Sequence, residues 1–217
     1  MRGVTEALAG GIRRVLAAPA VLAPVAVLSL LSPLYPNTAS PRVLVEYVLV
    51  SAFLAGGILD RYARARPTRA TGFFGACGRH FGAMIRLAAI EILLYLAADN
   101  VPSWYAAIAA AAAVNLIMVY ARVRLAVEDR RSAFGAVLAA ARFVARNPGA
   151  VVVYLLWAAA MLAVARGARG AAPILVLPLL ASATVFFQSR LAHAGYTAAP
   201  PMEWPESPAA EAIANRR

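Results

Sequence analysis

The stretch VYARVRLAVEDRRSAFGAVLAAARFVARNPGAVVVYLLW, from Val119 to Trp157, decides the fold class. Two long apolar runs flank a segment that holds six arginines and the adjacent acids Glu128 and Asp129. Apolar runs of this length are typical of helices that cross a membrane, and arginines between them mark the cytoplasmic side. The segment is therefore expected first to set the topology of a membrane protein, and second to contact lipid or protein.

The composition of the whole chain agrees with a membrane protein. Of the 217 residues, 62% are hydrophobic and 14% are charged, and the mean hydropathy is +0.70. Soluble domains are about 45–50% apolar and about 25% charged. The net charge is +11, and all 21 basic residues are arginine, which together with the high alanine content indicates a GC-rich bacterial genome. Because the arginines lie between apolar runs, we expect anionic lipid headgroups, and no nucleic acid, as their counter-charge.

The residue types that carry most enzyme chemistry are sparse. Cys77 is the only cysteine, and the two histidines, His80 and His193, lie far apart in the sequence. No HExxH, CxxC, GxGxxG, P-loop or GxSxG pattern occurs. The sequence therefore predicts no metal site, no cofactor and no catalytic activity.

Six segments have the length and apolar character of a membrane-spanning helix, which needs about 20 mostly apolar residues. They are Val15–Tyr35, Val43–Leu59, Phe81–Ala98, Trp104–Ala121, Pro148–Ala165 and Ala171–Ser189. Residues 1–31 mimic a signal peptide, but no clear A-x-A site follows, so the first segment is expected to stay as an uncleaved span.

Arginine is distributed unequally between the connections. Three arginines, Arg42, Arg166 and Arg169, lie in the connections after spans one and five, and the DNVPS connection after span three has none. The other eighteen lie on the opposite side. The positive-inside rule places that side, with both termini, in the cytoplasm of a bacterium, so the protein is expected in the inner membrane.

Three amphipathic segments precede the odd-numbered spans. They are Thr5–Leu16, Thr71–Phe81 and Ser132–Arg146, and each is expected to lie as a helix on the membrane surface. Their IRRV, GRHF and ARFV stretches align, and the even spans end in RYA, RLA and RLA. The spacings from Arg13 to Arg61, Arg79 to Arg124 and Arg142 to Arg190 are 48, 45 and 48 residues.

We therefore expect an all-α, polytopic membrane domain over residues 1–196, made of three repeats. Each repeat is an interfacial helix followed by a transmembrane hairpin, and the units are about 1–66, 67–130 and 131–196. Residues 197–217 form a tail rich in proline and glutamate, for which composition predicts an extended or disordered state. Trp204 is the candidate anchor of this tail to a neighbouring subunit.

The segment VEDRRSAFGAVLAAARFVARNPG, with the Arg-Leu-Ala that ends a span, resembles a broad bacterial group. This group comprises the six-helix membrane domains associated with glycerophosphodiester phosphodiesterases, and their stand-alone, mostly uncharacterised relatives. The resemblance covers most of the chain but rests chiefly on Arg122–Gly149. It implies the six-span architecture and no activity, because the catalytic barrel of those enzymes is absent and no catalytic residue carries over.

Glu91 is the clearest polar candidate inside the membrane. Span three places it near mid-bilayer, and the returning span places Asn115 at a similar depth. A proton or ion relay is one interpretation. The other is a protonated Glu91 that donates a hydrogen bond to Asn115 or to a backbone carbonyl. The structural interpretation is favoured, because no second acid or base at mid-depth completes a path.

Arginines of the long connections are candidate contacts to lipid headgroups or to a partner: Arg79, Arg124, Arg130, Arg131, Arg142 and Arg146. Glu128 and Asp129 are expected to pair with neighbouring arginines and fix the turn there. His80, beside Arg79, is expected to be solvated on a surface helix, and Cys77 to pack on its apolar stripe.

Three classes of function remain at this point. The first is a non-enzymatic accessory or scaffold subunit of a larger membrane complex, for which the alanine-rich face Ala106–Ala113 would let other helices approach closely. The second is a small transporter or channel for a lipid-like or amphiphilic solute, which would need a polar cavity at mid-depth. The third is an enzyme of lipid metabolism, which would need clustered histidines or acids that the sequence does not show.

Overall fold

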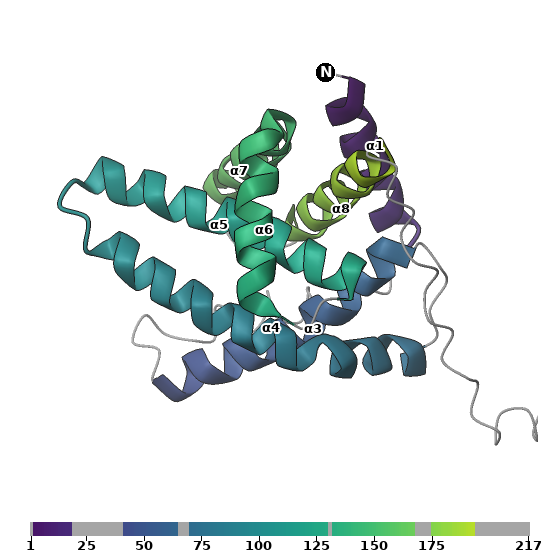
Figure 1. Cartoon of the computed structure of the whole chain (residues 1–217), viewed down its shortest axis with the longest axis horizontal. Helices are drawn as coiled ribbons and strands as arrows, with labels where there is room; N and C mark the ends of the chain where they lie inside the picture. Colours follow the sequence, from purple (N-terminus) through teal and green to yellow (C-terminus); the bar gives the residue numbers. More distant parts are fainter. Residues whose placement is uncertain (1, 19–40, 65–69, 130–131, 168–174, 194–217) are drawn as a thin grey trace, which may run out of the picture.

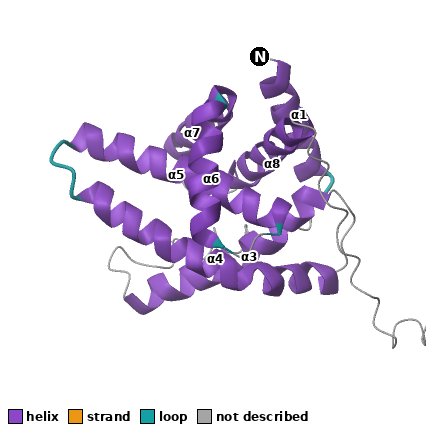
Figure 2. Cartoon of the chain, in the orientation of Figure 1, coloured by secondary structure: helices purple, strands orange, loops and turns teal. Residues whose placement is uncertain are grey.

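Seven α-helices and no strand make up the described part of the chain (Figure 2). The computed structural model describes residues 2–18, 41–64, 70–129, 132–167 and 175–193. The helices are α1 (Arg2–Leu16), α3 (Pro41–Arg64), α4 (Ala70–Asp99), α5 (Trp104–Glu128), α6 (Ala133–Arg146), α7 (Pro148–Gly167) and α8 (Val176–His193). The predicted all-α class is confirmed for these residues.

Three of the described helices are long and apolar enough to cross a membrane. They comprise Thr71–Asp99, Trp104–Glu128 and Pro148–Gly167, and they contain the predicted spans three, four and five. The predicted second span lies within α3, and Val176–Ser189 of the sixth lies within α8. The first predicted span, Val15–Tyr35, lies almost entirely outside the described residues, as does the C-terminal tail with Trp204.

Capping residues explain where α6 begins and ends. The Ser132 hydroxyl accepts a hydrogen bond from the Gly135 amide at 3.2 Å, as an N-cap does. Asn147 alone separates α6 from α7, and Pro148 occupies the first position of α7, where its missing N–H costs no hydrogen bond. The predicted break between the segment Ser132–Arg146 and the apolar segment that begins at Pro148 is therefore confirmed.

The corresponding break in the second unit was predicted wrongly. Thr71–Phe81 was expected as a separate interfacial helix, but it is continuous with the following span in the 30-residue helix α4. The reason is that no proline follows Phe81. The glycines Gly72, Gly75 and Gly78 each cost helix stability, but they do not remove a backbone donor as proline does.

The helices pack in pairs around a shared centre (Figure 1). Helix α1 packs against α8, α3 against α4, and α5 against α6. Helices α3, α5 and α8 also contact one another. The hairpin of α4 and α5 projects to one side of the molecule, whereas α6 crosses both of its helices steeply (Figure 1).

Small residues let two of these pairs approach closely. A Cβ atom placed on Gly11 of α1 would lie 2.1 Å from Ser182 Oγ of α8. A Cβ atom on Gly57 of α3 would lie 2.4 Å from Cys77 Sγ of α4. Cys77 is fully buried in this contact, so its predicted packing role is confirmed.

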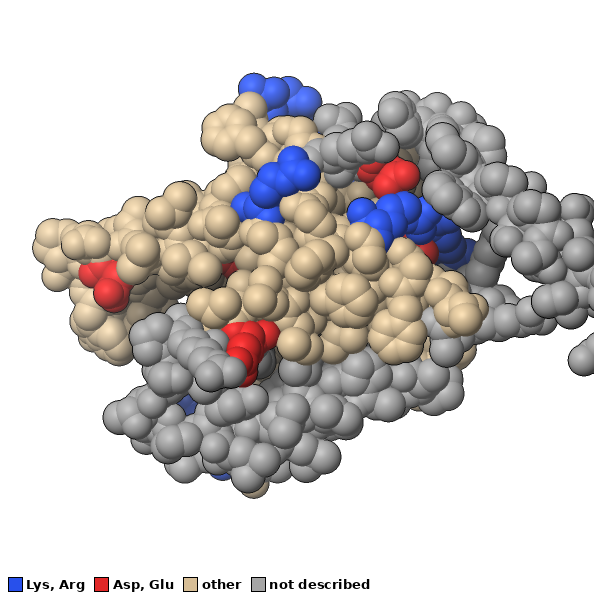
Figure 3. Space-filling model, turned by 90° about the horizontal axis from the view of Figure 1, so that it is seen from below, with Lys and Arg blue, Asp and Glu red and all other residues tan. Residues whose placement is uncertain are grey.

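Large apolar side chains are exposed on several helices. On the face shown in Figure 3, charged atoms occupy a few separate areas, and most of the described surface is uncharged. Exposed side chains include Leu93, Leu96, Trp104, Tyr105, Phe134 and Leu155. Such a surface is costly in water, but it matches a lipid or protein environment.

Candidate functional site

A buried carboxylate, Asp60, is the centre of a charged cluster where α3, α4 and α5 meet. Its Oδ1 atom lies 2.9 Å from Arg64 Nε, 3.0 Å from an Arg79 guanidinium nitrogen and 3.3 Å from His80 Nε2. The other ring nitrogen of His80 lies 3.9 Å from an Asp129 oxygen. His80 thus lies between two carboxylates from two different helix ends.

The local backbone positions each member of this cluster. Asp60 and Arg64 are one helical turn apart on α3, and Arg79 and His80 are neighbours on α4. Asp129 follows the last residue of α5 and adopts a left-handed conformation with φ 50°. This conformation is typical of the residue that ends a helix.

The electrostatics of Asp60 favour its charged form. Burial alone raises the pKa of the Asp60 carboxyl. The hydrogen bond from His80 and the positive charges of Arg64 and Arg79 outweigh this effect and hold the pKa below its ordinary value. The cluster is therefore a stable ionic junction between helices rather than a carboxyl group poised to take up a proton at neutral pH.

The structure corrects the prediction for His80. It was expected to be solvated, but it is only 3% exposed. Its partner Asp60 lies 20 residues earlier in the chain, so no local pattern identifies the contact. The one available signal was an acid at the end of the apolar run before the arginine-rich connection.

A second ion pair joins α4 and α5 between the predicted membrane spans. An Arg122 guanidinium nitrogen donates to Glu91 Oε2, and the Arg122 side chain is 28% exposed. Glu91 was expected to be protonated and to donate a hydrogen bond to Asn115 or to a backbone carbonyl, whereas its Oε2 atom accepts from Arg122. A full positive charge is a stronger partner for a carboxylate than an amide is, and the long arginine side chain can reach along the helix.

The other predicted arginines have different environments. Arg124 pairs with Glu128 at 2.8 Å, which confirms the expected role of Glu128. Arg79 belongs to the Asp60 cluster, whereas Arg142 and Arg146 are exposed on α6. Arg130 and Arg131 lie outside the described residues.

The Asp60 cluster and the Glu91–Arg122 pair are not connected by polar groups along α4. His80, Met84, Leu87 and Glu91 follow at intervals of three or four residues, so they share one face of the helix. Met84 and Leu87 are both buried. An apolar layer two side chains thick therefore separates the two charged groups on this face.

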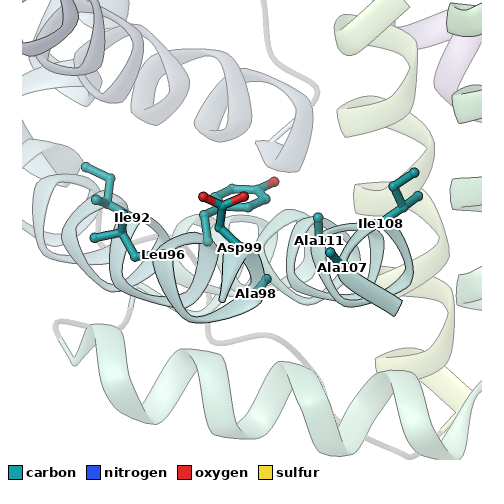
Figure 4. Close-up of a pocket in the computed structure, with 8 residues that line it drawn as sticks. Ile92, Leu96, Ala98, Asp99, Ala107, Ile108 and Ala111 are labelled. Carbon is teal, nitrogen blue, oxygen red and sulfur yellow. The ribbon is translucent and has the colours of Figure 1, made fainter. Parts of the chain in front are cut away.

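A shallow hollow of about 460 Å³ opens between α4 and α5 near the tip of their hairpin (Figure 4). It is lined by Ile92, Tyr95, Leu96, Ala98, Asp99, Ala107, Ile108 and Ala111. The lining is mostly apolar, and Ala107 and Ala111 provide small side chains one helical turn apart. Asp99 is its only charged residue.

The described residues contain no group of three or more histidine, cysteine, aspartate or glutamate side chains that could hold a metal ion. Comparison of the chain with protein-family models, with curated proteins and with solved structures gives no significant match. Function is therefore inferred from the geometry of the chain itself.

The ion pair between Glu91 and Arg122 generates a prediction for a double-mutant cycle. We expect Glu91→Leu and Arg122→Leu each to lower the free energy of unfolding by about 1–3 kcal/mol, because each leaves a part-buried charge unpaired. The double variant should lose less than the sum of the two, with a coupling of about 0.5–2 kcal/mol. Unfolding in detergent micelles measures all four proteins, and additive losses would contradict the pairing.

The Asp60 cluster generates a pH-dependent prediction. Because the folded-state pKa of Asp60 is lowered, its stabilising contribution is present above the unfolded pKa of about 3.9 and is lost as the pH falls through the folded-state value. We expect Asp60→Asn to lower stability by about 1–3 kcal/mol at pH 7. Its stability and that of the wild type should converge once the pH falls below the folded-state pKa of Asp60.

Asp99→Asn is the matched control, because Asp99 is exposed at the hairpin tip. It should leave the stability at pH 7 within about 0.5 kcal/mol of the wild type. Equal effects of the two substitutions would show that the contacts of Asp60 do not stabilise the fold.

Proposed function

We propose that the chain is a six-span protein of the bacterial inner membrane that serves as a non-enzymatic accessory or scaffold subunit of a membrane complex. It is made of three repeats, and both termini are cytoplasmic. Its partners are the transmembrane helices of other subunits and the anionic lipids of the inner leaflet. The resemblance around Arg122–Gly149 supports this architecture and adds no activity.

The pairing of the helices supports the repeat. Helix α4, which begins with the interfacial segment of the second unit, packs against α3 of the first unit. Helix α6 of the third unit packs against α5 of the second. Helix α1 of the first unit packs against α8 of the third and closes the cycle. A chain of three equivalent units arranged around an axis would produce this pattern.

The burial of aligned residues supports the same register. Gly11, Cys77 and Ala140 occupy equivalent positions in the three interfacial segments, and all three are buried. Two positions later come the arginines of the alignment, Arg13, Arg79 and Arg142, and all three are exposed. A chance alignment of alanine-rich segments would not be expected to match buried and exposed positions in this way.

Helix α6 has the surface of an interfacial helix. Its alanines Ala133, Ala136 and Ala140 are buried against the protein. Two of its large apolar side chains point outwards, with Phe134 73% and Leu138 46% exposed. Exposed Arg142 and Arg146 follow one and two turns further along the same side. This arrangement suits a helix with apolar side chains in the acyl region and guanidinium groups at the phosphates.

The hollow on the α4–α5 hairpin is the observation that carries the scaffold function. Ala107 and Ala111 form a floor of small side chains, and Ile92, Leu96 and Ile108 border it. In a bilayer, where lipid tails are as apolar as leucine, close packing over small residues drives helices together. The hollow therefore fits a transmembrane helix of another protein better than it fits a polar solute.

The ion pairs also favour a structural role over transport. Three acids, Asp60, Glu91 and Glu128, are each neutralised by an arginine of the same chain. A transporter of a polar solute would need such groups to face a cavity at mid-depth, whereas the hollow between α4 and α5 lies at the hairpin tip.

The proposed orientation predicts the outcome of reporter fusions. Alkaline phosphatase fused after Pro102 should be active, because the arginine-free hairpin tip is expected outside the cytoplasm. The same enzyme fused after Ser132 should be inactive, because the arginine-rich connection stays inside. Green fluorescent protein at the same two sites should give the reverse result, and the opposite pattern from both reporters would reject the orientation.

The proposed docking site predicts which substitutions release a partner. We expect Ala107→Leu combined with Ala111→Leu to lower the recovery of a co-purifying membrane protein about tenfold or more, because the side chains fill the hollow. Tagged protein purified in mild detergent, followed by quantitative mass spectrometry, measures the recovery.

Ala109→Leu combined with Ala113→Leu is the control, because these exposed alanines lie outside the hollow and the change in hydrophobicity is identical. It should leave the recovery unchanged. The scaffold proposal would be overturned if the two double variants recovered the co-purifying membrane protein equally well. It would also be overturned if no membrane protein co-purified stoichiometrically with the wild type.

A further inference from the structure

The ends of α1 and α3 are joined by two reciprocal arginine contacts. A guanidinium nitrogen of Arg14 in α1 donates to the backbone carbonyl of Tyr62 in α3. A guanidinium nitrogen of Arg61 in α3 donates, at 3.5 Å, to the carbonyl of Ala17 just beyond α1. Each arginine thus reaches the last turn or the end of the other helix, where carbonyl groups lack helical partners.

Both arginines lack an acidic partner within the described residues, which distinguishes them from the other part-buried arginines. Arg64, Arg122 and Arg124 each pair with a carboxylate. Arg14 is half-buried, and burial lowers the pKa of its guanidinium. Carbonyl dipoles at two helix ends offset part of this cost, but they supply no full negative charge.

The proposed repeat allows an internal comparison of this position. Arg14, His80 and Phe143 each follow the aligned arginine of their unit. His80 meets two carboxylates, whereas Phe143 packs its ring 5.3 Å from that of Tyr120 and 5.0 Å from that of Phe187. The first unit alone has a charged group at this position without a charge or ring partner in the described structure.

We propose that the junction of α1 and α3 binds a phosphate group through Arg14 and Arg61. Arginine is suited to this ligand, because its planar guanidinium donates paired hydrogen bonds to phosphate oxygens. The proposal rests on the proposed membrane orientation, which places this junction at the inner leaflet. The phosphate belongs either to the headgroup of an anionic lipid or to a soluble phosphate.

The test uses the full chain, purified in a mild uncharged detergent, with native mass spectrometry as the readout. The probes are phosphatidylglycerol, phosphatidylcholine and inorganic phosphate, each titrated separately. A phosphatidylglycerol site should bind that lipid in preference to phosphatidylcholine. Each arginine contact that is lost should weaken the binding about fivefold. We therefore expect about a fivefold loss of affinity for Arg61→Gln, and about a 30-fold loss for Arg14→Gln combined with Arg61→Gln.

A matched control removes two positive charges elsewhere. Arg86→Gln with Arg166→Gln changes exposed arginines on α4 and α7, and it should leave the affinity within twofold of the wild type. If the double variant at the junction does not fold, Arg61→Gln alone is compared with the wild type. The hydrogen bond of Arg61 to the Ala17 carbonyl is long and exposed, so its loss should not prevent folding.

Each outcome decides between the alternatives. Phosphatidylglycerol binding lost in the junction variants supports the proposal and identifies a lipid headgroup. Inorganic phosphate binding lost in the same variants supports it and identifies a soluble source. Equal binding by wild-type and junction variants, or equal losses in the control, overturns it. The scaffold proposal is tested separately by partner recovery, so failure of one is distinguishable from failure of the other.

Discussion

A carboxylate buried among helices is stable only where cations or hydrogen-bond donors approach it, because the apolar surroundings do not solvate its charge. Asp60 satisfies this requirement with Arg64 of its own helix and with Arg79 and His80 of α4. His80 then extends the contact to the end of α5 through Asp129. The mutual positions of three helices thus depend on neutralising one negative charge, and the glycine contact between α3 and α4 brings the groups within reach.

At two helix contacts, small residues face the interior in place of large apolar side chains. In α6 the small alanines face the interior and the large Phe134 and Leu138 face outwards. At the contact of α1 and α8, Gly11 replaces the large interior side chain that a soluble protein would use. This arrangement is favourable where lipid covers the outer surface, since close packing of small residues then replaces the hydrophobic effect as the source of helix association.

The sequence predicts these elements unequally well, for physical reasons. The limits of α6 follow from Ser132 and Pro148, because caps and proline act through local backbone hydrogen bonds. The continuity of α4 was missed, since glycines weaken a helix without ending it. The partners of Glu91 and His80 depend on which helix faces meet, and periodicity does not contain that information. The one acid paired correctly, Glu128, lies one turn from its arginine.

The two ends of the hairpin units are suited to different partners. The tip of the α4–α5 hairpin carries no arginine, and its exposed surface is mostly apolar, so it offers packing without charge. The opposite ends of α3 and α5 carry the ion pairs, and the α1–α3 junction leaves Arg14 and Arg61 for an anion. In the proposed orientation, protein contacts form in the outer half of the bilayer and phosphate contacts at the inner leaflet. The two kinds of partner therefore do not compete for one surface, and a subunit of this design can bind lipid and protein together.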